Sequence, residues 1–135
     1  MDLKKFSMAT VGGFFAMFIP GGLWHMLIMK DFYEKYAGDS ALAEPNILFI
    51  ILGVLILSAL MAYMYPQGYK GGSPLKEGLR FGVVIGLLWI LPINVIMIGI
   101  MGTSKTLVVV DALYHMVGQG IGGIVIGYIY GSKSS

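Results

Sequence analysis

Four long apolar segments, separated by short polar stretches, dominate the pattern of this chain. They cover about residues 6–29, 46–65, 78–101 and 106–130. Each reaches or exceeds the roughly 20 residues that a helix needs to cross about 30 Å of hydrocarbon. Because lipid offers the backbone no hydrogen bonds, segments of this kind are expected to be helical. The pattern predicts an all-α membrane protein in which residues 1–135 form a single four-helix transmembrane bundle.

The composition agrees with this class. The 135 residues are 57% hydrophobic and 12% charged, whereas soluble domains carry about 25% charged residues. There is no cysteine, which excludes disulfides and thiolate metal sites. The net charge of +2 gives no reason to expect a nucleic-acid partner. The first apolar segment is too long for a signal peptide and has no small-residue cleavage site, so it should remain as a membrane helix.

The basic residues are distributed unevenly between the two ends of the predicted bundle. Six belong to the N-terminus, the connection between the second and third segments, and the C-terminal end: Lys4, Lys5, Lys70, Lys76, Arg80 and Lys133. The opposite end has three, which are Lys30, Lys35 and Lys105. The positive-inside rule therefore predicts a multi-pass protein of the cell membrane with both termini in the cytoplasm.

Five polar residues inside the apolar segments are candidates for a single site. The only two histidines, His25 and His115, lie in the similar tetrapeptides Leu23-Trp24-His25-Met26 and Leu113-Tyr114-His115-Met116. Asp111 lies one turn before His115, and the helical rise of about 1.5 Å per residue places Asp111 at about the depth of His25 and His115 about one turn deeper. Ionisable side chains are costly in hydrocarbon and mark functional sites. We therefore expect a polar cluster in the outer half of the bundle, made of Asp111, His115, His25, Asn94 and Gln119.

Four interpretations of this cluster remain open. It can be a structural hydrogen-bond network, with bonds of about 0.6 kcal/mol each. It can be a pathway for protons or a small molecule, in which Asp111 orients His115. It can hold haem b between His25 and His115. It can bind a divalent metal through both histidines and Asp111. No catalytic motif is present, so we expect a small, non-enzymatic membrane protein that binds a ligand or a partner.

Glycines and prolines indicate how the helices pack. The last segment carries a glycine stripe with small-xxx-small spacing, which lets a second helix approach closely: Gly120, Gly123, Gly127 and Gly131. This predicts either a central helix or the interface of a homodimer or larger membrane complex. Pro20 and Pro92 lie near the middle of the first and third segments, where each is expected to kink its helix.

The two halves of the chain show a weak likeness. Phe18-Ile19-Pro20 matches Ile90-Leu91-Pro92 at an offset of 72 residues. Parallel repeats of this kind occur in transporters. The bundle is therefore interpreted as a candidate duplicated helical hairpin.

Two stretches carry a family resemblance. Gly22-Leu23-Trp24-His25 leads to Asp31-Phe32-Tyr33, and Val110-Asp111-Ala112-Leu113-Tyr114-His115 opens the glycine-rich last segment. The chain resembles small four-helix protein families of the bacterial inner membrane that are catalogued as domains of unknown function. The resemblance implies an integral four-helix protein without an established substrate, and it transfers no catalytic residues.

Overall fold

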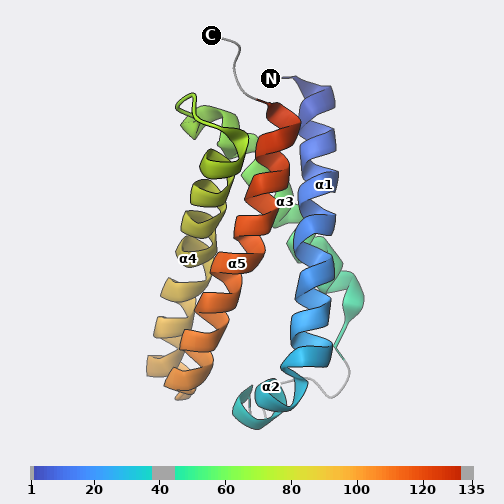
Figure 1. Ribbon diagram of the computed structural model, residues 1–135. Helices are drawn as coiled ribbons and strands as arrows, with labels where there is room; N and C mark the ends of the chain where they lie inside the picture. Colours follow the sequence, from blue (N-terminus) through green and yellow to red (C-terminus); the bar gives the residue numbers. More distant parts are fainter. Residues whose placement is uncertain (1, 38–44, 132–135) are drawn as a thin grey trace.

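The structure, a computed structural model, describes residues 2–37 and 45–131 of the chain. The helical elements in order are α1 (Leu3–Leu23), the π-helix η1 (Trp24–Ile28), α2 (Lys30–Ala37), α3 (Ile47–Gly68), α4 (Pro74–Met101) and α5 (Lys105–Tyr130). Within these two ranges, four stretches are long and apolar enough to cross a membrane: α1 with η1, α3, α4 and α5 (Figure 1). The predicted all-α class with four apolar helices is confirmed.

Polar caps set the beginnings of the helices. The Asp2 side chain accepts a hydrogen bond from the Lys5 backbone N–H, and Ser73 Oγ accepts one from that of Lys76. Each cap satisfies a backbone donor that the first turn leaves free. As a result, α1 and α4 begin at Leu3 and Pro74, somewhat before the limits of the apolar segments.

The prolines lie inside helices but do not act alike. α4 remains one α-helix through Pro92, whereas α1 changes to a π-helix four residues after Pro20, where Met29 N–H donates to the Trp24 carbonyl at 2.8 Å. α3 runs through Pro66 to Gly68, beyond the expected end of the second segment at residue 65, and Tyr65 is buried in its last turns. The change of helical geometry is therefore confined to the first crossing, just where His25 lies.

α5 is the central helix, and α4 packs closely against it. Cβ atoms added at Gly78, Gly82 or Gly86 of α4 would overlap carbonyl oxygens of α5. On the α5 side of this contact, three glycines of the predicted stripe face α4 residues: Gly120, Gly123 and Gly127. The stripe thus serves contact within the chain.

Gly131 does not continue this stripe. It caps the end of α5 with a φ of +74°, and an added Cβ would meet nothing within 4 Å. Since α4 covers Gly120 to Gly127, a homodimer or larger complex would have to use a different surface of the bundle.

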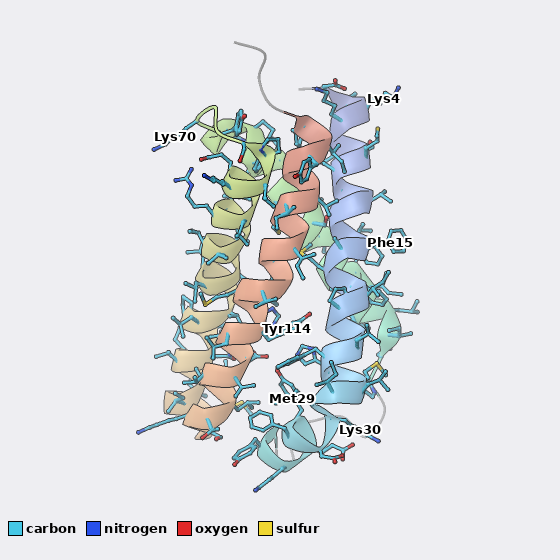
Figure 2. All side chains as sticks on the ribbon, viewed as in Figure 1. Lys4, Phe15, Met29, Lys30, Lys70 and Tyr114 are labelled. Atoms are coloured by element: carbon cyan, nitrogen blue, oxygen red, sulfur yellow. The ribbon has the colours of Figure 1, made fainter. Side chains whose placement is uncertain are left out.

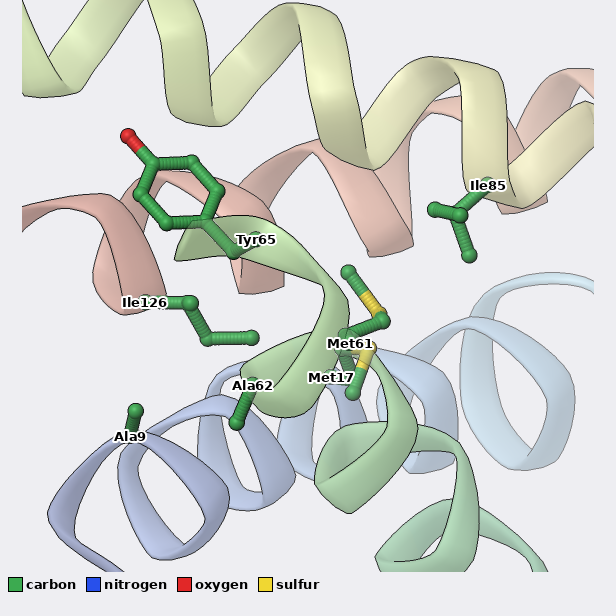
Figure 3. Close-up of a cluster of buried hydrophobic side chains, with 7 residues drawn as sticks. All are labelled: Ala9, Met17, Met61, Ala62, Tyr65, Ile85 and Ile126. Atoms are coloured by element: carbon green, nitrogen blue, oxygen red, sulfur yellow. The ribbon is translucent and has the colours of Figure 1, made fainter. Parts of the chain in front are cut away.

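The opposite side of α5 faces α1. A Cβ at Gly122 would meet the side chain of Met17 at 2.6 Å, and one at Gly13 of α1 would meet Ile126 at 3.0 Å. Between these helices and α3 lies the buried apolar core shown in Figure 3, formed by Ala9, Met17, Met61, Ala62, Tyr65, Ile85 and Ile126.

α3 contributes to only one half of the bundle. All of its buried residues come from its second half: Ser58, Met61, Ala62 and Tyr65. Its first half has no buried residue and crosses behind α1 in Figure 1. We call the half that holds η1, the end of α4 and the start of α5 the distal half. The polar residues of the distal half are therefore enclosed mainly by α1, η1, α2, α4 and α5.

Candidate cation site

Asp111 is the centre of a polar cluster in the distal half. Its Oδ1 lies 3.7 Å from Nε2 of His25 and 3.7 Å from Nε2 of His115. The side chains of Asp111 and His115 are 15% and 13% exposed, whereas that of His25 is 34% exposed. Asp111 and His115 are one turn apart on α5 and share a face. His25 reaches them from η1.

Both imidazoles are oriented by a second contact. Nδ1 of His25 lies 3.0 Å from the carbonyl oxygen of Gly21, and Nδ1 of His115 lies 3.2 Å from Oε1 of Gln119. Carbonyl oxygens only accept hydrogen bonds, so each Nδ1 must carry the hydrogen. In the neutral ring, Nε2 then presents its lone pair to the carboxylate.

Two other side chains donate hydrogen bonds to the carboxylate. Asn94 Nδ2 donates to Oδ2 of Asp111 at 2.8 Å, and the Tyr33 hydroxyl donates to Oδ1 at 3.1 Å. Tyr33 also accepts a hydrogen bond from Trp24 Nε1 at 3.2 Å. Burial raises the pKa of Tyr33, so its hydroxyl keeps its proton and remains a donor at neutral pH.

Aromatic rings surround the histidines. Trp24 stacks on Tyr114, with ring centroids 5.3 Å apart, and Tyr114 presents its edge to His25 at 4.8 Å. Trp89 of α4 contacts His115 at 5.0 Å from the far side. The Trp24–Tyr114 pair also forms part of the wall of an apolar groove of about 490 Å³ between η1 and α5. Figure 2 shows Tyr114 facing the first crossing at this level.

The five residues predicted from the sequence lie together. Asp111 contacts His25, His115 and Asn94 directly, and Gln119 contacts His115. The sequence analysis missed Tyr33. Its position depends on Met29, whose φ of −114° and ψ of 18° interrupt the helix and let α2 turn back toward α5. Two signals were available: an aromatic residue shortly after the predicted end of the first crossing, and its place in the stretch Asp31-Phe32-Tyr33 that carries the family resemblance.

The geometry favours a metal ion over haem. The ligand atoms of His25, Asp111 and His115 lie within 4.8 Å of one another. A porphyrin held by both imidazoles would have to fill the space between their Nε2 atoms. Asp111 Oδ1, 3.7 Å from each, already occupies the edge of that space. A single ion needs no such space and can contact all three atoms.

A family model matches most of the chain. It is the model of a protein family of unknown function, DUF1761, and it matches residues 8–127. The chain belongs to this family. The DUF1761 match covers all five cluster residues, the whole of α4, and α5 as far as Gly127. No curated protein and no solved structure matches the chain. The resemblance to families of unknown function is thus confirmed, and the functional argument rests on the site.

Proposed function

We propose that this DUF1761 protein binds a metal cation in the polar cluster of its distal half. The observation that carries the proposal is the convergence of three electron-rich atoms. Two imidazole Nε2 atoms lie at 3.7 Å from one carboxylate oxygen, while both Nδ1 atoms face carbonyl oxygens. Lone pairs and a carboxylate repel one another at low dielectric unless a positive charge lies between them. A bound cation supplies that charge.

The surroundings of the cluster support a binding role over a purely structural one. A structural network pairs donors with acceptors. Here the carboxylate already receives hydrogen bonds from Tyr33 and Asn94. With both rings neutral, the two Nε2 atoms add acceptors to this network and no donor. Such an arrangement adds little to helix packing in the absence of a cation.

We also propose that the end of the bundle carrying Leu3 and Tyr130 faces the cytoplasm. Lys5 Nζ donates to the Tyr130 carbonyl at 3.2 Å, which brings the start of α1 beside the end of α5. Lys4 and Lys70 lie at this end in Figure 2, and Lys30 lies at the other. The basic residues concentrate at the first end, as the positive-inside rule requires of a cytoplasmic face.

Cysteine labelling tests this orientation, because the chain has no cysteine of its own. A membrane-impermeant maleimide should label Thr106→Cys in intact cells and should label Ser73→Cys only after lysis. Both positions are exposed. The opposite labelling pattern would reverse the orientation and place the cluster near the cytoplasm.

The Asp111→Asn variant tests cation binding. At pH 8.5, above the ordinary imidazole pKa of about 6.5, the metal-free variant should unfold at the same temperature as the parent or higher. The amide offers an N–H to the histidine lone pairs and removes the repulsion. With excess binding cation, only the parent should gain stability, by about 5 °C or more. Thermal unfolding in detergent measures both comparisons. The unfolding temperatures of parent and variant are compared first with chelator and then with chlorides of Zn²⁺, Mg²⁺, Ca²⁺ or Na⁺.

A matched control is Glu34→Gln, which neutralises an exposed carboxylate of α2. It should respond to cations as the parent does. A structural network predicts instead that Asp111→Asn is less stable than the parent under every condition, with no effect of any metal. If acidification stabilises the parent and no metal does, the positive charge is a proton. Either result would refute metal binding.

A further inference from the structure

We infer that the cation is a transition metal of the Zn²⁺ class, coordinated by Nε2 of His25, Oδ1 of Asp111 and Nε2 of His115. This inference rests on the proposed function, because it concerns the same site. It adds the class of metal, the three coordinating atoms and an open coordination position.

The donor atoms select the class of metal. Mg²⁺ and Ca²⁺ prefer shells made only of oxygen. Two imidazole nitrogens and one carboxylate oxygen suit Zn²⁺ and its neighbours Co²⁺ and Ni²⁺ instead. The chain has no cysteine, so thiolate does not compete as a ligand. The cluster thus has the composition of a two-histidine, one-carboxylate metal site.

The spacing fits after a small adjustment. Bonds of about 2.0–2.2 Å in a tetrahedral site place ligand atoms about 3.4 Å apart. Each histidine nitrogen is 3.7 Å from Oδ1, and the three atoms lie within 4.8 Å of one another. The main change needed is a movement of His25 toward His115. His25 is the more exposed histidine and belongs to the π-helix, whereas His115 and Asp111 share α5.

The outer contacts match those of metal sites. Histidines that bind metals usually donate their other ring N–H to a carbonyl or carboxylate, which fixes the tautomer and the ring orientation. Gly21 O and Gln119 Oε1 are placed for this role. Tyr33 and Asn94 hold the carboxylate in the same manner and leave it further lone pairs for a metal.

Three protein ligands leave one position of a tetrahedral ion open. Structural zinc sites use four protein ligands, whereas sites that bind water or an exchangeable ligand use three. With neutral imidazoles, a divalent ion and one carboxylate retain a net charge of +1. The open position therefore favours water, hydroxide or a small anion as the fourth ligand.

Metal titration of the full-length protein tests the inference. After treatment with chelator in detergent, the parent should bind one Zn²⁺ per chain by calorimetry. Bound Co²⁺ should give the intense visible absorption of four-coordinate cobalt. His25→Gln, His115→Gln and Asp111→Asn should each weaken Zn²⁺ binding by more than about 100-fold, beyond the loss expected for an outer contact. Glu34→Gln should bind as the parent does.

Circular dichroism identifies any variant that fails to fold, and the cobalt spectrum of the parent needs no variant. Weak octahedral cobalt absorption, or Zn²⁺ binding that survives all three substitutions, would overturn the assignment of ligands. Saturable binding of Mg²⁺, Ca²⁺ or Na⁺ without Zn²⁺ or Co²⁺ would overturn this inference and leave the proposed function standing. The absence of binding for every cation would refute both.

Discussion

Gly82→Ala is expected to destabilise the bundle by about 1–3 kcal/mol, the usual cost of forcing an extra methyl group into a packed interface. The added Cβ would overlap the backbone carbonyl of Gln119 on α5. A flexible side chain could rotate away, but a helical backbone cannot. α4 would therefore have to move away from α5 along the contact that also includes Gly78 and Gly86.

Gly99→Ala is the matched control on the same helix. A Cβ at Gly99 meets nothing within 4 Å, and alanine favours helix by up to about 1 kcal/mol relative to glycine. This variant should be as stable as the parent or more stable. Reversible unfolding in mixed detergent micelles measures both changes. Equal stability of the two variants would contradict the close α4–α5 contact.

Tyr33→Phe is expected to weaken Zn²⁺ binding by about 10- to 100-fold, as loss of an outer-shell hydrogen bond does in metal sites. The substitution keeps the ring beside His25, at a centroid distance of 4.5 Å. It removes the hydroxyl that donates to Asp111 and accepts from Trp24. The carboxylate then loses one of the two donors that orient it. Calorimetry with Zn²⁺ measures the loss.

Tyr36→Phe provides the comparison, because Tyr36 lies on the same short helix and contacts Phe32, not the cluster. Its Zn²⁺ affinity should equal that of the parent. A role of Tyr33 in folding alone would lower thermal stability and leave the affinity of the folded protein unchanged. That outcome would remove Tyr33 from the site.

The sequence predicted the helices and the five cluster residues for physical reasons. Long apolar segments must be helical in lipid, and a four-residue spacing puts Asp111, His115 and Gln119 on one face of α5. Depth alone then suggested His25 and Asn94 as their neighbours. Depth does not determine rotation about the helix axis, so only the structure brings His25 into contact with Asp111.

Tyr33 shows where this reasoning stops. It is eight residues beyond His25 in the chain, and an uninterrupted helix would carry it away from the cluster by about 12 Å. The π-helix and the break at Met29 return it to Asp111. Such a local break follows from packing against α5, which a periodic pattern does not encode.

The glycine stripe was ambiguous for a related reason. Small residues indicate that a helix approaches closely, but they do not identify that helix. α4 carries the complementary series Gly78, Gly82 and Gly86 at four-residue spacing, and this second signal went unused.

The path of α3 was not predictable for another reason. Hydropathy does not distinguish apolar side chains that face lipid from those that face protein. The departure of α3 from the distal half was therefore not predictable.

X-ray absorption spectroscopy at the zinc edge of the Zn²⁺-loaded protein tests the central claim most directly. A metal held by His25, His115 and Asp111 should show two imidazole nitrogens and a first shell of four nitrogen or oxygen atoms at about 2.0–2.2 Å. His115→Gln should reduce the imidazole contribution to one. A six-oxygen shell without imidazole scattering, identical in the parent and the variant, would contradict the account.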